Sequence, residues 1–339
     1  MAKNKELNEE ALSICSALKI AIGLDKDANC VTHGGRLIAV TPVGTVYTPF
    51  PLELTTAFKA QDLYNALDGC DKPFTINEDP VKSVLSVSWG RRRAKLDTLP
   101  KVAVYAPTLD PIQNTQIGEG FKETLHDFVV DLISRANDVS SSVVLFDGYE
   151  AFWTNRQIAA RLQSNTWFPP ILAFVNDLRV VTSVAGKIVG IGGTAHSVTF
   201  HFDNETAIKI ALADDSSISY PGGALRSLFN DDLFETEYPI TDEFREGLAY
   251  VAKFADQVIF VSPEHIGTDS NPAVGTAIDN DDMPLNLRFF AETIKLGAFK
   301  GADVIVKPSG STKTIGFFTR KKSSTFAFVR VKTQGENND

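Results

Sequence analysis

The stretch PFPLELTTAFKAQDLYNALDGCDKPFTINEDPVKSVLSVSWGRRRAKLDTLP, residues 49–100, holds the pattern that decides the fold. Apolar and polar residues alternate near both of its ends, which predicts strands, and apolar residues recur at helical spacing from Ala60 to Leu67. Gly69 follows, at a place where glycine commonly ends a helix. A second alternating run turns at Gly90 and continues beyond it. The stretch therefore predicts strand, short helix, strand and hairpin in that order.

The same order of elements occurs twice more, in residues 168–214 and 284–332. The helical segments KAQDL (59–63), FVNDL (174–178) and FAETI (290–294) align with one another. Repetition of this kind indicates a chain built from similar structural units.

An amphipathic helix is predicted at the head of each third of the chain, because apolar residues follow one another at the same helical steps in residues 7–22, 121–136 and 244–259. A hairpin is predicted after each of the first two helices, with turns at residues 33–35 and at Asp147-Gly148. Two helices and several strands in each unit predict an α+β fold, in which each of three repeated domains places its helices against antiparallel sheet.

Three domains fit the length, because a third of 339 residues is an ordinary size for a domain with its own core. We expect their boundaries in two segments without periodic pattern, residues 106–116 and 222–239. The predicted domains are 1–112, 113–229 and 230–332, followed by a polar tail, 333–339, that we expect to be disordered.

Composition indicates a soluble globular protein, with 43% hydrophobic and 22% charged residues. No apolar run approaches the ~20 residues that cross a bilayer, and the polar start lacks the core of a secretory signal. The three cysteines, Cys15, Cys30 and Cys70, all lie in apolar patterns. An odd and small number of cysteines favours a protein from a reducing compartment. We therefore expect the three cysteines to be small buried side chains that form no disulfide.

The formal net charge is −9, from 33 Lys and Arg against 42 Asp and Glu. Taken alone this sum disfavours a nucleic-acid binder, but it does not exclude a basic stripe on one face.

Motifs for cofactor or metal chemistry are weak. Residues 190–193 (GIGG) resemble part of a dinucleotide loop but precede no predicted helix, and a glycine-rich strand connection is the simpler interpretation. His196 and His201 have no Cys or carboxylate at ligand spacing. The acidic residues 279–282 lack the glycine and the terminal Glu of a calcium loop. We therefore expect no metal, no cofactor and no catalytic set.

The repeated helix heads, the segments PLELTTAFKAQDLYNALDGC (51–70) and LSVSWGRRRAKLDTLP (85–100), and the run FDGYEAFWTNRQIAAR (146–161) resemble a DNA polymerase sliding clamp of the bacterial β type, in a divergent form such as a bacteriophage encodes. The resemblance covers about residues 5–332. It implies a DNA clamp fold in which two chains, head to tail, close a ring with sheets outside and helices lining the hole.

The resemblance also implies function and partners. It implies a non-enzymatic processivity factor in DNA replication, which encircles duplex DNA and tethers the polymerase. The implied partners are double-stranded DNA, a DNA polymerase, a clamp loader and a second copy of the chain, with no membrane. The implied location is the cytoplasm of a bacterium or of an infected host cell.

Sliding along DNA requires phosphate contacts without base recognition. The resemblance implies that cations on or next to the lining helices make these contacts. Any single Lys or Arg is ordinarily a solvated surface charge, so the prediction concerns the face that these cations share. The basic runs 91–93 and 320–322 are interpreted as exposed turns instead. The predicted DNA-binding residues are Lys19, Lys26, Lys59, Lys122, Arg135, Arg179, Lys187, Arg245, Lys253, Arg288, Lys295 and Lys300.

Clamps of this family also bind short peptides of their partners in a groove between the second and third domains. Matching residue by residue places Thr154, Gln157 and Ala159 on one side of this groove and Val329 and Val331 on the other. The family's Gly-His pair is replaced here by Arg-Gln at 156–157, which predicts a different partner motif. Ordinary strand packing is the alternative interpretation of the two valines.

The predicted dimer edge is Val102 and Val104, placed on the last strand of the first domain and facing the third domain of a partner subunit. Two other classes of function stay open at this level. One is a viral structural or scaffold protein of repeated α/β domains without DNA function, and the other is an enzyme whose site the sequence does not reveal.

Overall fold

The computed structural model forms two compact units, Met1–Ile117 with Asp177–Leu212 and Gly118–Asn176 with Ala213–Asp339. The three-domain division is not tested by these units and stays a prediction. The structure describes residues 8–42, 44–104, 107–133, 135–136, 138–156, 158–214, 220–230, 238–239, 246, 259–262, 265–268, 271–274, 284–285, 304–309, 314–321 and 324–330.

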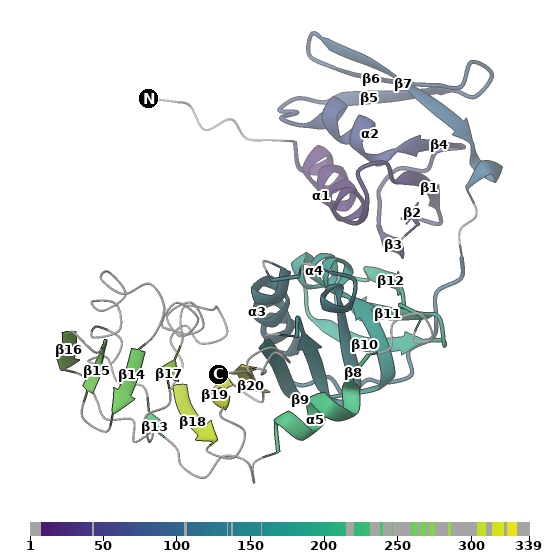
Figure 1. The fold of residues 1–339 in the computed structure, drawn as a ribbon. Coiled ribbons are helices and arrows are strands. Elements are labelled where there is room, and N and C mark those ends of the chain that lie inside the picture. Colours follow the sequence, from purple (N-terminus) through teal and green to yellow (C-terminus); the bar gives the residue numbers. More distant parts are fainter. Residues whose placement is uncertain are drawn as a thin grey trace. The chain divides into compact units, whose positions relative to one another are not determined.

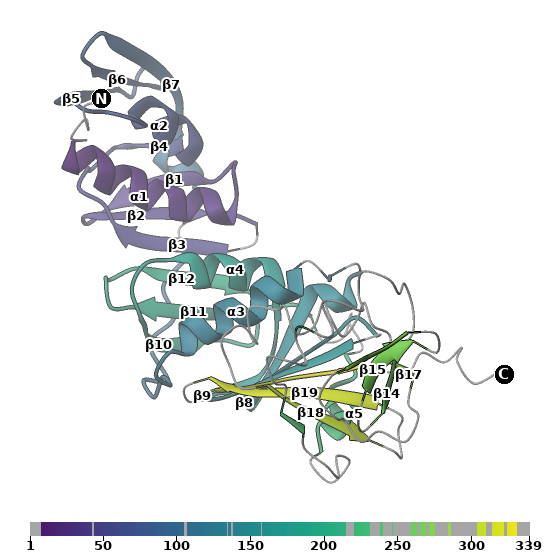
Figure 2. The ribbon, with the colours of Figure 1, turned by 90° about the vertical axis from the view of Figure 1, so that its left-hand side faces the viewer.

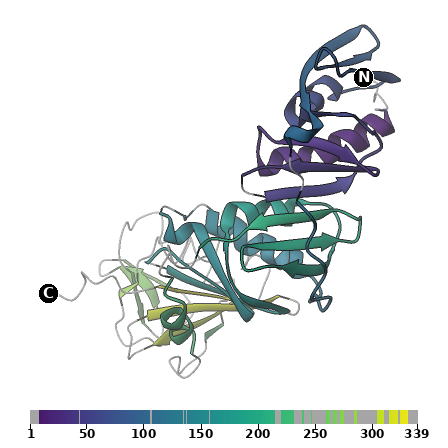
Figure 3. The same ribbon diagram turned by 90° about the vertical axis from the view of Figure 1, so that its right-hand side faces the viewer.

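The first unit contains one ten-stranded antiparallel sheet with the order β10-β11-β12-β3-β2-β1-β4-β7-β6-β5. Strand β12 pairs with β3, Ile208 opposite Val46, so late strands extend the sheet made by early ones (Figure 3). The strands are β1 (Asn29–His33), β2 (Arg36–Val40), β3 (Gly44–Pro49), β4 (Thr56–Lys59), β5 (Phe74–Asp79), β6 (Val84–Trp89), β7 (Arg92–Pro100), β10 (Ile188–Gly193), β11 (Ser197–Phe202) and β12 (Ala207–Ala211).

Helices α1 (Glu9–Leu24) and α2 (Ala60–Leu67) lie together on one face of β1 and β4 (Figure 2). The side chain of Asn8 caps α1 by accepting a hydrogen bond of 3.1 Å from the Ala11 N–H. The apolar stripe of α1 is buried, with Ile14 and Leu18 fully covered. Both helices confirm the periodicity seen in the sequence, and α4 (Val175–Ser183) confirms the corresponding helix of the second repeat.

The second unit contains a six-stranded sheet, β13-β18-β19-β20-β9-β8, and a four-stranded sheet, β16-β15-β14-β17. Figure 1 shows α3 (Phe121–Ile133) and α5 (Gly222–Leu228) on opposite faces of β8 and β9. The strands are β8 (Val143–Thr154), β9 (Ile158–Phe174), β13 (Tyr238–Pro239), β14 (Ile259–Ser262), β15 (His265–Thr268), β16 (Asn271–Val274), β17 (Pro284–Leu285), β18 (Val304–Ser309), β19 (Thr314–Lys321) and β20 (Ser324–Arg330).

Aromatic side chains join α3 to the sheet. The ring centroids of Phe121 and Phe168 lie 5.7 Å apart, and those of Phe146 and Phe168 lie 4.6 Å apart. Such ring pairs add about 1 kcal/mol each beyond the area they bury. The strands predicted around 304–306, 315–317 and 327–329 are confirmed by β18, β19 and β20. Of the helix predicted at 244–259, the structure describes only Glu246, which is helical, and Ile259, which begins β14. The helix predicted near 291–298 and the tail 333–339 lie outside the described residues.

The hairpin predicted at Asp147-Gly148 is wrong. Strand β8 continues through both residues, and its register against β9 shifts on each side of Gly148. Gly148 has φ 66°, so the conformational freedom of the Asp-Gly pair serves a β-bulge here. The chain reverses later, between β8 and β9, where Arg156 has φ 72° and Asn155 Oδ1 accepts a 2.9 Å hydrogen bond from the Ile158 N–H.

The glycine-rich residues 190–193 form part of β10 and permit a close approach. Asn114 pairs with Ile191 through two backbone hydrogen bonds of 2.9 Å, one in each direction. A Cβ on Gly192 would collide with the carbonyl oxygen of Pro111. These glycines are therefore structural, as expected, and they let residues 110–114 lie along the edge of the sheet.

Asp110 fixes the same segment from the side. Its carboxylate accepts hydrogen bonds from Lys209 Nζ at 2.9 Å, Thr199 Oγ1 at 2.8 Å and Ser197 Oγ at 3.3 Å. Burial would raise the pKa of Asp110, but these donors, Lys209 first, hold that pKa below its ordinary value. The buried carboxylate thus ties the segment to β11 and β12.

Candidate functional site

Three of the predicted DNA-binding cations lie at or near α1 and α2. Lys19 is exposed on α1, and its Nζ lies 5.5 Å from the centre of the Tyr64 ring on α2. Lys26 is exposed in the turn after α1. Lys59 immediately precedes α2, and its Nζ lies 3.4 Å from Asp27 Oδ1 at the surface. The structure therefore brings this group together on the helix side of the first unit.

Two further cations belong to the second repeat of helices. Arg179 is exposed on α4. Lys187 was predicted on this helix, and that placement is wrong, because α4 ends at Ser183. Gly186 has φ 93°, which leaves the helical region, and the Lys187 N–H donates to Asp203 Oδ1 at 2.9 Å.

The remaining predicted cations are less exposed or lie elsewhere. Lys122 is half-buried on α3, and Arg135 is half-buried just after the end of that helix. Five others lie outside the described residues, namely Arg245, Lys253, Arg288, Lys295 and Lys300.

Helices α1 to α4 carry more acidic than basic side chains. Their only Lys and Arg are Lys19, Lys122 and Arg179. This composition limits the phosphate affinity that these helices supply, because each neutralised phosphate requires a cation. Their acidic residues are Glu9, Glu10, Asp62, Glu123, Asp127, Asp131 and Asp177.

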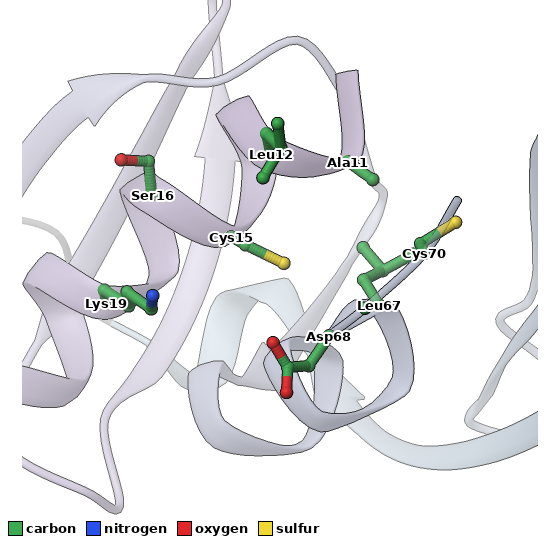
Figure 4. A pocket seen from close by; sticks show the side chains of 9 residues that line it. Ala11, Leu12, Cys15, Ser16, Lys19, Leu67, Asp68 and Cys70 are labelled. Carbon is green, nitrogen blue, oxygen red and sulfur yellow. The ribbon is translucent and has the colours of Figure 1, made fainter. Parts of the chain in front are cut away.

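A pocket of about 310 Å³ opens between α1 and the end of α2 (Figure 4). The Cys15 side chain points into it, and burial, followed by the nearby Asp68 carboxylate, raises the pKa of Cys15 to about 11. The thiol therefore stays protonated at neutral pH and is a poor nucleophile. All three cysteines are free and buried, which confirms their predicted role as small core residues.

The predicted peptide groove is partly assembled by strand register. Thr154 on β8 pairs with Ala159 on β9, and Ala159 pairs with Val329 on β20. Three of the five predicted residues are thus neighbours across three adjacent strands. The other two, Gln157 and Val331, lie outside the described residues.

The described groove side chains are covered. Ala159 is 0% exposed and Thr154 is 5% exposed. Ala159 belongs to a buried cluster with Phe152 on the same sheet face, Phe318 on β19, and Leu225 and Phe229 at α5. The packing of α5 against this sheet face was not predicted from the sequence.

Polar contacts also join α5 to the sheet. Arg226 Nη2 lies 2.7 Å from Asp147 Oδ2, and Arg226 Nε lies 3.5 Å from Glu150 Oε2. Arg161 Nη1 donates to the Phe229 carbonyl at 3.2 Å. These contacts place the apolar side of α5 directly on β8 and β9.

The predicted dimer edge is misplaced in one respect. Strand β7 ends at Pro100, and Val102 lies in a 3₁₀ turn (Lys101–Ala103) with Val104 directly after it. The placement of both valines on a strand is therefore wrong. The reason is local. The Pro100 nitrogen has no N–H to donate to a neighbouring strand. The Lys101 Nζ, directly after it, donates hydrogen bonds to the carbonyls of Thr32 and Leu54.

In the part of the chain that the structure describes, no group of three or more His, Cys, Asp or Glu side chains is placed to hold a metal ion. None of the described helices combines the length and the apolar character that a membrane span requires.

Comparison with known proteins defines the class of fold. No protein-family model matches the chain, and no curated protein matches its sequence. Solved structures do match, and they share the α+β DNA clamp fold that the sequence resemblance implied.

Particular matches cover almost the whole chain. A Helicobacter pylori β clamp in complex with 3,4-difluorobenzamide has a TM-score of 0.73 and 10% identity, over 96% of this chain and 98% of that chain. A DNA polymerase sliding clamp from Pseudomonas aeruginosa has a TM-score of 0.70 and 15% identity, over 95% and 98%. A Helicobacter pylori β clamp bound to a DNA ligase peptide has a TM-score of 0.70 and 10% identity, over 94% and 98%.

Proposed function

We propose that this protein is a DNA sliding clamp, a non-enzymatic processivity factor that encircles duplex DNA and tethers a replicative polymerase. The observation that carries the proposal is the clamp fold over about 96% of the chain, together with almost the full length of the clamps compared. The exposed cations at α1, α2 and α4 add the phosphate contacts that sliding requires. No observation favours the scaffold protein or the enzyme.

The ring requires two chains, and the sheet order suggests where they meet. A sheet edge offers unpaired N–H and C=O groups to a second chain. The β10 edge of the ten-stranded sheet is engaged by Asn114, whereas β5 ends the sheet order at the other side. We therefore move the proposed dimer edge from Val102 and Val104 to β5, in a head-to-tail contact that closes into a ring.

The proposed partners follow from the function. They are double-stranded DNA, a DNA polymerase, a clamp loader and a second copy of this chain. The Helicobacter pylori clamp bound to a DNA ligase peptide supports a peptide partner as well. The proposed location is the cytoplasm of a bacterium or of a bacteriophage-infected cell.

Two measurements test this proposal. Sedimentation in solution should give a mass of about twice 37.0 kDa for a two-chain ring, and a monomer or a large open assembly would contradict it. Loaded protein should also stay on nicked circular DNA and leave when the DNA is cut once.

A further inference from the structure

The pocket between α1 and the C-terminal end of α2 has walls and charges that suit a small organic cation (Figure 4). We propose that it binds a primary ammonium ion that carries an apolar body about the size of one aromatic ring. The proposal follows from the side chains of this pocket alone and does not rest on the clamp function.

The walls of the pocket are mostly apolar. Leu12 and Ala11 on α1 line it together with Leu67 on α2, and the Cys15 side chain points inward (Figure 4). An apolar cavity of ~150 Å³ accepts a benzene molecule in another protein, whereas the volume here is about 310 Å³. A ring with a short alkyl chain therefore fits, and it would cover part of Leu12, which is 47% exposed.

The Cys15 thiol favours an apolar group at the inner end of the pocket. Cys15 is 8% exposed, and its Sγ makes no hydrogen bond with the described residues. A protonated thiol behaves as a small apolar group with a weak donor, so it is a better neighbour for a ring than for a charge. We therefore place the apolar body of the ligand against Cys15 and its ammonium group at the rim.

A carboxylate lies at that rim. Asp68 lines the pocket directly after α2, and its Oδ1 accepts a hydrogen bond of 3.2 Å from the Tyr64 hydroxyl. Among the described residues Asp68 takes part in no ion pair. Its second oxygen therefore remains able to accept a charge-assisted hydrogen bond from a ligand ammonium group.

The end of α2 adds to the negative potential. Residues 67–70 all line the pocket, and the last turn of α2 has no basic side chain. The C-terminal end of a helix attracts cations because its last carbonyl groups point outward. An ammonium group at the rim would thus be stabilised both by Asp68 and by the helix end.

Lys19 is the one cation that lines the pocket, and it does not neutralise Asp68. Its Nζ lies 5.5 Å from the centre of the Tyr64 ring. Burial is the main cause of the raised pKa of Cys15, and after burial the Asp68 carboxylate raises this pKa by more than Lys19 lowers it. Negative charge therefore prevails in the pocket, which favours a cation over an anion of the same shape.

An occupied pocket would add one positive charge beside α1 and α2, on helices where acidic side chains outnumber basic ones. It would thereby strengthen the attraction of this surface to phosphates. This consequence, unlike the site itself, rests on the proposed function.

The experiment titrates the full-length, ¹⁵N-labelled protein with 2-phenylethylamine and follows the amide resonances of residues 11–19 and 67–70. A ligand of this size should bind with a dissociation constant of about 1 mM. The neutral 2-phenylethanol should bind roughly fivefold more weakly, because it lacks the charge that Asp68 recognises. The anionic phenylacetate, with the same ring, should not bind measurably.

Variants test the two halves of the site. Cys15→Met fills the pocket with a longer side chain and should weaken binding of the amine by about tenfold or more. Asp68→Asn, an exposed substitution, should weaken it roughly fivefold and abolish the preference over the alcohol. Ser13→Ala on α1 and Asp62→Asn in the first turn of α2 do not line the pocket and should bind as the native protein does.

Each contrary result overturns a stated part of the proposal. Equal affinity for the amine and the alcohol, or unchanged affinity in Asp68→Asn, would show that the carboxylate does not select a cation. The absence of saturable shifts at residues 11–19 and 67–70 would show that the pocket is not the site. Asp68→Asn leaves the core intact and so decides the matter if Cys15→Met fails to fold. No DNA is present in the titration, so its failure leaves the proposed clamp function untouched.

Discussion

Asp110 is the residue whose charge contributes most clearly to the stability of the first unit. Its carboxylate is buried and accepts hydrogen bonds from Lys209, Thr199 and Ser197. The folded pKa lies below the unfolded value of about 4, so the contribution is complete above pH ~4 and is lost as the pH falls through the folded pKa.

We predict that Asp110→Asn lowers the free energy of unfolding by about 2 kcal/mol at pH 7, because Lys209 loses its buried partner. The difference from the native protein should shrink at pH 3. Urea denaturation at the two pH values measures it, with the exposed Asp97→Asn as the matched control. A loss of the same size at both pH values would contradict the assigned role of the charge.

Asp177 has the opposite behaviour. It is buried in the first turn of α4, and its Oδ2 makes no hydrogen bond. Burial raises the pKa of Asp177 to about 6. The ionised form is therefore destabilising, and its cost develops as the pH rises from about 4 to above 6.

We predict that Asp177→Asn raises the free energy of unfolding by about 1 kcal/mol at pH 7.5, since the variant no longer buries a charge. The gain should vanish near pH 4, where the native carboxyl is protonated. Thermal unfolding across this range tests the effect. A variant that is less stable than the native protein at pH 7.5 would show that the carboxylate has a favourable role.

At the scale of elements, periodicity predicted what local spacing controls. The apolar positions of α1, α2, α3 and α4 recur at helical steps, so these helices were predictable within a few residues. The Asp147-Gly148 pair was ambiguous, because a positive φ at Gly148 suits a bulge as well as a turn. Lys187 was misplaced because α4 ends at Ser183, and Gly186 just before Lys187 has a positive φ that no helix continues through.

The helix α5, which covers the predicted groove residues, was predictable from its apolar spacing. Leu225, Leu228 and Phe229 recur at helical spacing after Pro221, inside a segment interpreted as a linker from its glycines. The register that joins Thr154, Ala159 and Val329 was not predictable from spacing, since strands distant in sequence meet only in the folded sheet.

The edge strand β10 gives a prediction of its own. Gly192→Val should destabilise the first unit by about 2 kcal/mol or more, because the side chain collides with the Pro111 carbonyl and forces residues 110–114 off the sheet. Limited proteolysis within 107–117 and thermal unfolding measure this. Gly223→Ala on α5, where a Cβ meets nothing within 4 Å, is the control and should be neutral or slightly stabilising. Unchanged protection in Gly192→Val would contradict the close approach.

At the scale of the whole molecule, the acidic helices bear on how DNA is held. Few cations on α1 to α4 imply weak attraction to phosphates, so the proposed function requires that a closed ring, and not affinity, keeps the protein on DNA. We predict that the affinity for open linear DNA is weak and decreases as the salt concentration rises. Complexes loaded on circular DNA should stay intact at the same salt concentrations. Gel filtration in rising NaCl separates these two cases. Circular and linear complexes that dissociate at the same salt concentration would contradict topological retention.

The cations that are present should still assist loading. Lys19→Glu with Arg179→Glu should reduce loading on circular DNA several-fold, because both exposed side chains lie on helices assigned to the DNA side. Lys82→Glu, exposed in the turn between β5 and β6, is the matched control and should load normally. Equal loading of the double variant and the native protein would remove these residues from the DNA interface.

The central claim is that two copies of this chain enclose duplex DNA. The most direct measurement isolates protein loaded on nicked circular DNA and then cuts the circle once with a restriction enzyme. The account predicts that the protein co-elutes with the closed circle and is released after the cut, while blocking both DNA ends preserves the complex. Protein that stays equally on cut and closed DNA, or never associates with the circle in the presence of its loader, would contradict it.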